Sequence, residues 1–278
     1  MQILFTLCGL IAVGFVPLIT IYLVISGIPA IRKVGLANFL FGKTWAAGQD
    51  QYGILPLILT SIYGTAGAIA IGVPIGFFTA VFLAKAAPKK VADILRPTVS
   101  LLAGIPSVVY GLVGMCVLVP ALRNWLDLPA GDSLLAAILV LAVMILPSII
   151  SLSETALEAV PKEYEEASLA LGATKLETYF RVSAPVAKSG IAAAVVLGIG
   201  RAIGEAMAIM MVAGNVANMP ALTRSVRFLT TGISIELNYS QDGSLQRQAL
   251  FSIGLVLFLF IMLINAFLNL VLKREKEA

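Results

Sequence analysis

The sequence predicts an all-α integral membrane protein with six transmembrane helices, and its composition and long apolar segments carry that prediction. Of its 278 residues, 59% are hydrophobic and only 12% are charged, whereas an average soluble domain is roughly 45–50% apolar and about 25% charged. So few charges cannot cover the surface of a soluble body of this size. The composition therefore excludes a soluble enzyme, a disordered chain and a nucleic-acid-binding protein.

Six apolar segments are long enough to cross a bilayer, which takes about 20 residues in a helix. Five of them carry no charge, and the other carries only Arg201 and Glu205. The first segment lacks a basic leader and is too long for a signal peptide, so we expect a transmembrane helix there. The expected spans are 3–25, 54–84, 98–122, 134–152, 189–213 and 249–272.

The distribution of basic residues predicts the orientation of these spans. With six spans both termini lie on one side, together with the loops 85–97 and 153–188. That side holds eleven Lys and Arg residues against seven on the other, and basic residues favour the cytoplasm. We therefore expect cytoplasmic termini. The chain then divides into a first helix with its outer loop (1–53), a five-helix domain (54–272) and a cytoplasmic tail (273–278).

The expected cytoplasmic loop 153–188 is long and carries charges of both signs. Pro161 followed by acidic residues such as Glu163 is typical of a helix N-terminus. Gly172 stands where a glycine commonly ends a helix. These signals predict a helix at about Pro161–Leu171.

A second helix is predicted in the same loop. Thr174 with Glu177 three residues later is a capping-box pattern, and the helix should run to about Val182 before Pro185 breaks the chain. Composition alone favours a simple solvated helix pair. The residue spacing across both helices indicates more than that.

This loop resembles the EAA loop of the permease subunits of bacterial ABC importers. The family pattern is Glu-Ala-Ala, three residues, Gly, nine residues, Ile, one residue and Leu-Pro. The spacing is kept here over 20 residues, with Ser168 and Ala184 as departures and Val182 in place of Ile. The matching positions are Glu166, Ala167, Gly172 and Pro185.

The resemblance implies a coupling helix that docks into a cleft of an ATP-binding subunit and passes on its closure. The residues that it assigns to this role are Glu166, Ala167, Ser168 and Gly172. A short helix held between two spans can move with them as a rigid lever. We therefore expect Glu166→Lys or Gly172→Asp to uncouple ATP hydrolysis from transport.

The charged pair inside the fifth expected span lies near the bilayer midplane, because Arg201 is equally far from Ser189 and Ala213. A charge at that depth costs roughly 2.5–3.5 kcal/mol. One explanation is an intrahelical ion pair with Glu205 at i,i+4 spacing. Another is an anion path, in which the Arg201 fork meets phosphate or sulfate oxygens and Glu205 orients it. The two explanations are compatible, and both stay open here.

The sequence around Arg201 and Glu205, together with two other segments, makes the resemblance more specific. The runs 198–208 and 102–111, and Arg247 with the last span, resemble the PstC-type permease of the phosphate ABC importer. The resemblance covers essentially the whole chain. It implies that 54–272 is a type I ABC transmembrane domain, in a multi-pass protein of the bacterial cytoplasmic membrane that carries phosphate.

The resemblance also implies the partners. They are a PstA-type permease as heterodimer partner, two PstB-type ATPases, an extracytoplasmic PstS-type phosphate-binding protein and the lipid bilayer, with no nucleic acid. ATP and Mg would be bound by the ATPase, and no cofactor or metal by this chain.

The sequence itself supports a transport subunit and not an enzyme. It has no histidine and only two cysteines, Cys8 and Cys116, both in apolar runs, so His-based catalysis and Cys-rich metal sites are excluded. Residues 37–44 match a relaxed Walker A pattern but lack its glycine-rich turn between strand and helix.

Three alternatives stay open. The same machine could carry sulfate, molybdate or another anion with an unchanged fold. An ATP-independent channel or secondary transporter would leave the EAA-like spacing without an ATPase to dock. A membrane scaffold without transport would leave the cost of a midplane arginine unexplained.

Overall fold

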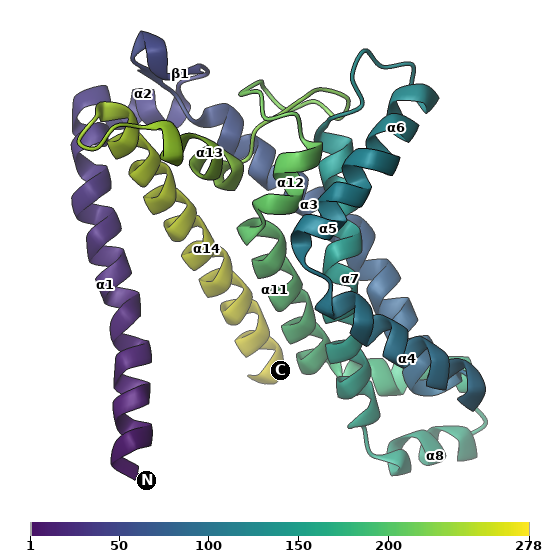
Figure 1. Ribbon diagram of the computed structural model, residues 1–278. Helices are drawn as coiled ribbons and strands as arrows, with labels where there is room; N and C mark the ends of the chain where they lie inside the picture. The colour runs from purple at the N-terminus through teal and green to yellow at the C-terminus, as the bar shows by residue number, and fades with distance from the viewer. Residues whose placement is uncertain (1, 278) are drawn as a thin grey trace.

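The computed structural model describes the backbone of residues 2–277 and the side chains of residues 4–11 and 13–266. It is a set of long helices, joined at one end by a hairpin and short helices and at the other by a helical loop (Figure 1). The α-helices are α1 Gln2–Val34, α2 Leu36–Phe41, α3 Leu55–Val81, α4 Lys89–Gly104, α5 Ser107–Val113, α6 Val119–Trp125, α7 Leu134–Glu158, α8 Lys162–Ala170, α9 Lys175–Thr178, α10 Ala184–Val186, α11 Lys188–Gly204, α12 Met207–Val212, α13 Leu229–Glu236 and α14 Leu245–Glu277.

Shorter elements complete the described chain. Three π-helical segments, η2 Phe82–Ala86, η3 Gly114–Leu118 and η4 Tyr179–Ser183, continue or precede α-helices. Two 3-10 turns are η1 Ala47–Gln49 and η5 Leu237–Tyr239. The strands β1 Trp45–Ala46 and β2 Gln51–Tyr52 pair antiparallel, with Trp45 opposite Tyr52.

The centre of the molecule is the packing of α7 against α3 and α11. Ile145 and Ile149 of α7 are completely buried. On α3, Gly72 and Gly76 face them so closely that an added Cβ would come within 2.8 Å of one isoleucine or the other. Small residues let membrane helices approach each other's backbones, so van der Waals contact holds α3 and α7 together.

A second apolar cluster joins α1, α14 and the hairpin. Phe39 and Ile253 are completely buried within it. The Ser252 hydroxyl of α14 donates to the Gly27 carbonyl of α1 at 2.6 Å. Most large apolar side chains along the rest of α1 are exposed, as Phe5 is. Such a surface suits a helix whose surroundings are hydrocarbon and not water.

Five of the six predicted spans are present as single helices. Within the described residues, five helices are long and apolar enough to cross a membrane. A sixth crossing requires that the pair Lys175–Val186 and Lys188–Gly204, bent by 72°, be taken as one broken span. The predicted tail 273–278 lies outside the residues whose side chains are described.

The third predicted span, 98–122, begins too early. Residues 98–104 belong to the end of α4, and the apolar helix runs from Ser107 to Trp125. Ile105 has an extended backbone (φ −70°, ψ 128°), because the ring of Pro106 disfavours a helical conformation in the residue before it.

The two ends of the molecule differ in character. The N-terminal end of α1 and the helix α8 lie toward one end, and α14 runs in that direction (Figure 1). The hairpin, α13 and the end of α6 lie toward the other (Figure 1). The end with α8 is the one predicted to be cytoplasmic, and that orientation stays a prediction.

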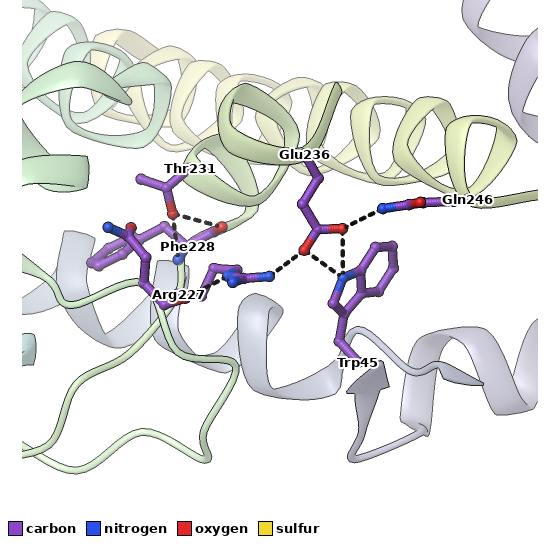
Figure 2. A network of polar contacts seen from close by, with 7 residues as sticks. Trp45, Arg227, Phe228, Thr231, Glu236 and Gln246 are labelled. Atoms are coloured by element: carbon purple, nitrogen blue, oxygen red, sulfur yellow. Dashed lines mark hydrogen bonds and ion pairs between the residues drawn. The ribbon is translucent and has the colours of Figure 1, made fainter. Parts of the chain in front are cut away.

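A polar network fastens the hairpin end together (Figure 2). Glu236 of α13 accepts hydrogen bonds from Trp45 Nε1 at 2.9 and 3.0 Å and from Gln246 Nε2 at 3.1 Å. It also forms an ion pair with Arg227, and both side chains are only 17% exposed. Arg227 Nε donates in turn to the Asn215 carbonyl at 2.8 Å. One carboxylate thus links β1, α14 and the loop before α13.

We expect Glu236→Ala to destabilise the protein by roughly 2–4 kcal/mol, because it leaves a mostly buried guanidinium, indole and amide without their acceptor. Thermal unfolding of the purified protein in detergent measures the effect. Asp242→Ala is the control, since Asp242 pairs with Arg247 but is 90% exposed, and such a pair contributes little. Equal melting shifts in the two variants would contradict the expected role of Glu236.

Candidate functional site

The predicted fifth span is interrupted in its middle. α11 ends at Gly204, and Glu205 has an extended backbone (φ −71°, ψ 131°) before α12 begins at Met207. The continuous helix predicted over 189–213 is therefore wrong at this point. The helix that carries Arg201 therefore ends immediately before Glu205.

Glu205 holds the break together through its side chain and its backbone. Its Oε1 accepts the Ala208 N–H at 2.9 Å, which caps the first turn of α12. Its carbonyl accepts the Thr230 hydroxyl at 2.7 Å. In hydrocarbon a freed backbone group has no water to bond with, and these two contacts satisfy two of the groups at the break.

Arg201 points elsewhere. Its Nη1 donates to the Ser148 hydroxyl of α7 at 3.2 Å, and no Arg201–Glu205 ion pair occurs among the described residues. The predicted intrahelical ion pair is thus corrected to a contact between two spans. The side chain of Glu205 is occupied by its cap, which leaves Arg201 with a neutral partner.

Arg201 and Ser148 line an open cavity of about 670 Å³. Asn265 of α14 adds a third polar side chain, while Val196 and Leu197 supply apolar wall. A guanidinium donates several hydrogen bonds in one plane, a hydroxyl can donate another, and an amide can donate or accept. This set can bind an anion whose oxygens accept hydrogen bonds.

The glycines beside Arg201 leave the cavity side of α11 open. Gly200 lines the cavity, and no described atom lies within 4 Å of the Cβ position that Gly200 or Gly204 would carry. Gly198, in contrast, packs against Ile149 of α7. The glycine-rich run therefore packs on one side and borders the cavity on the other.

Sequence reasoning missed Ser148, Thr230 and Asn265. Ser148 and Asn265 are polar residues inside apolar spans, which is itself a signal of a functional or pairing role in a membrane. Thr230 lies in the short helix α13, and nothing in its local sequence relates it to Glu205.

The helical loop follows its predicted pattern at its start. α8 spans Lys162–Ala170, and Gly172 has φ +90° as the residue that ends it. Thr174 and Glu177 form the predicted capping box. The backbone N–H and hydroxyl of Thr174 bond the Glu177 carboxylate and hold its pKa below the usual value.

The predicted coupling residues divide between two directions. Glu166 and Ala167 are exposed, whereas the Ser168 hydroxyl lies 3.0 Å from that of Thr178 and ties α8 to α9. Leu171 beside Gly172 is 91% exposed. This end of the loop thus offers a small mixed surface to a partner.

The chain does break before the fifth span, as predicted, but two residues after Pro185. The second helix continues through η4 and α10 to Val186, and the sharp bend comes at Ala187. Pro185 lies inside this continuous helical run, where its nitrogen cannot donate a hydrogen bond, and the π-helical segment η4 directly precedes it.

The nucleotide-binding pattern at residues 37–44 does not have the structure of a P-loop. Residues 37–44 form most of α2 and the turn before β1, so helix precedes strand, the reverse of a P-loop. No group of three or more His, Cys, Asp or Glu side chains is arranged to hold a metal within the described part of the chain.

The known proteins that this chain is similar to are permease components of transport systems. The model of the family described as "Binding-protein-dependent transport system inner membrane component" matches residues 72–277. The chain is 39% identical over 273 residues to the "Probable ABC transporter permease protein YqgH" of Bacillus subtilis (strain 168), which covers 95% of this chain and 88% of that protein. It is 34% identical over 281 residues to the "Phosphate transport system permease protein PstC" of Haemophilus influenzae, covering 93% and 88%.

Solved structures support the fold alone. A chain of a bacterial alginate ABC transporter, crystallised with a periplasmic protein that holds an alginate pentasaccharide, aligns with a TM-score of 0.68 at 16% identity, covering 98% of this chain and 93% of that one. A chain of the inward-facing MetNI methionine ABC transporter aligns with a TM-score of 0.59 at 20% identity, covering 80% and 94%. The fold is that of a type I ABC importer permease.

Substitution can separate two roles of Glu205, the cap on the Ala208 N–H and an ion pair with Arg201. Glu205→Gln keeps an Oε1 acceptor for the Ala208 N–H, so we expect near-normal thermal stability. Glu205→Ala removes the cap and should cost about 1 kcal/mol. Thermal unfolding in detergent compares them. Equal destabilisation by Gln and Ala would instead indicate that the negative charge is what matters, as an ion pair with Arg201 requires.

Proposed function

We infer that this chain, which belongs to the family of binding-protein-dependent transport system inner membrane components, is the PstC-type permease subunit of an ATP-driven phosphate importer. The observation that carries the proposal is Arg201 on an open cavity inside a broken span, with Ser148 as its neutral partner. Relatives named as phosphate permeases, at 31–34% identity over most of the chain, favour phosphate as the anion.

The geometry suggests how an anion passes. Arg201 carries a permanent charge, and its donors suit phosphate oxygens in pairs. When the path is empty, Ser148 accepts one of these donors. An arriving anion replaces Ser148 as the acceptor, and the hydroxyl can then turn to donate to the same anion. The exchange keeps the guanidinium hydrogen-bonded throughout.

The permease supplies the path and the lever, and the ATPase supplies the energy. We propose that α8 is the coupling helix, with Glu166, Ala167, Ser168 and Gly172 at or beside the docking surface. Closure of two PstB-type ATPases would draw the coupling helices of this subunit and a PstA-type partner together and open the path outward. ATP and Mg would be bound by the ATPases, and a PstS-type protein would deliver phosphate to the outer face of the bacterial inner membrane.

We expect Arg201→Ala to lower phosphate uptake roughly 10- to 100-fold, the worth of a charged hydrogen-bonding group. Uptake and ATPase activity are measured in proteoliposomes that contain the whole complex, with phosphate-loaded and then sulfate-loaded binding protein. Ser148→Ala is the milder companion variant and should cost roughly 2- to 10-fold. Unchanged uptake by Arg201→Ala would remove Arg201 from the path, and stimulation by sulfate would assign another oxyanion as cargo.

We expect Glu166→Lys or Gly172→Asp to leave the subunit inserted while phosphate uptake stops and ATP hydrolysis no longer responds to the binding protein. Gly172 has φ +90° and open space around it, so a side chain there strains the backbone that ends α8. The matched control is Gly243→Asp, because Gly243 has φ +75° and equally open space but lies before α14 at the hairpin end. Wild-type uptake by both loop variants would contradict the coupling role.

A further inference from the structure

Neighbouring glutamates on α8 face in different directions. Glu166 is exposed. Glu165 is turned inward, its side chain 21% exposed, and its Oε1 lies 2.5 Å from Lys85 Nζ. The same oxygen accepts the Ser183 hydroxyl at 2.9 Å. Lys85 is still more deeply covered, with a side chain only 10% exposed.

These contacts join three separate parts of the chain. Lys85 belongs to η2, which continues α3 at its α8 end, and Ser183 belongs to η4, which leads through α10 to α11. Among the hydrogen bonds and ion pairs of the described residues, Lys85–Glu165 is the one that links α8 to the α3–η2 span. Both Lys85 and Ser183 stand in π-helical segments, which are frequent at functional sites.

Apolar side chains of α3, α7 and η4 pack together at the same end of the molecule. Phe180 of η4 packs edge-on against Phe77 and Phe78 of α3, with ring centroids 6.4 and 6.0 Å apart. The apolar residues Val81, Leu157 and Val160 are buried beside them. The side chains of Lys85 and Glu165 are only 10% and 21% exposed, so leaving either charge without its partner would be costly.

The α3 span leads from this contact toward the cavity. Gly72 and Gly76 of α3 press on Ile145 and Ile149 of α7. Ser148, the partner of Arg201, lies between those two isoleucines in the sequence of α7. A displacement of Lys85 along or around the span axis therefore reaches α7 through close packing.

We propose that Lys85, Glu165 and Ser183 form the joint through which displacement of the coupling helix is transmitted to the span α3 and onward to the cavity. The proposal rests on the proposed function, because it presumes that an ATPase moves α8. Glu166 faces that ATPase, and Glu165 faces the permease. Glu165, Lys85 and Ser183 are positioning residues and do not touch the anion.

The test uses the complete complex in proteoliposomes, with Lys85→Glu, Glu165→Lys and the double charge swap. Co-purified ATPase and the phosphate taken up per ATP hydrolysed are both measured. Each single reversal should retain the ATPase while uptake per ATP falls roughly 5- to 10-fold, within the usual range of coupling between sites. The swap restores opposite charges and should recover most of the loss.

A control variant and two milder substitutions complete the test. Asp242→Asn breaks the ion pair of Asp242 with Arg247, which lies at the hairpin end of the molecule and outside the joint, and should leave uptake per ATP unchanged. If a charge reversal prevents folding, Glu165→Gln and Ser183→Ala replace it and should lower uptake per ATP in the same direction.

The outcomes separate this inference from the proposed function. Normal uptake per ATP in the single variants, or a swap no better than the worse single variant, overturns the joint while the transporter stands. Loss of ATPase from Glu165→Lys also overturns it, since Glu165 would then belong to the docking surface. A wild-type complex without ATPase or without phosphate uptake overturns the proposed function and the joint together.

Discussion

A helix that is interrupted inside a membrane must find partners for its freed backbone groups within the protein, and the region around Arg201 is built on that constraint. Thr230 bonds the Glu205 carbonyl, and the Glu205 side chain bonds the Ala208 N–H. With both groups satisfied, α11 can end where it does. Arg201 is then carried on the last turn of a helix, free of Glu205 and turned toward α7.

The element that bonds the break is also tied to the hairpin end. α13, which supplies Thr230, is itself held by Glu236 to Trp45 and Gln246. The loop between α12 and α13 is fixed by Arg227 and by backbone bonds to the start of α7, such as Leu134 N–H to the Arg224 carbonyl. The site thus lies between a polar assembly at one end of the molecule and the contact of Lys85 with Glu165 at the other.

Sequence reasoning succeeded where the determining physics is local. The apolar segments are continuous stretches of the sequence, and the glycine that ends α8 and the Thr174–Glu177 capping box depend on residues within one or two turns of each other. Pro106 carried an equally local signal for the end of α4, because the residue before a proline avoids the helical region. Weighing it would have placed the third span correctly.

The remainder of the site could not be predicted this way. The i,i+4 rule that paired Arg201 with Glu205 presumes an unbroken helix, and the partner that permits the break, Thr230, is 25 residues away along the chain. Lys85 and Glu165 are likewise separated along the chain by α4 and two complete spans. The tertiary fold, and not the spacing along the chain, determines which charged side chains form pairs.

The π-helical segments η2 and η4 have a consequence for how this chain compares with others. A π-turn holds one residue more than the α-turn that it replaces, so side chains beyond it are rotated about the helix axis. A relative that lacks the extra residue would show a one-residue gap in the middle of a helix, where gaps are usually dismissed as misalignment. At 82–86 and 179–183 such a gap would instead mark a change in where Lys85 or Ser183 points.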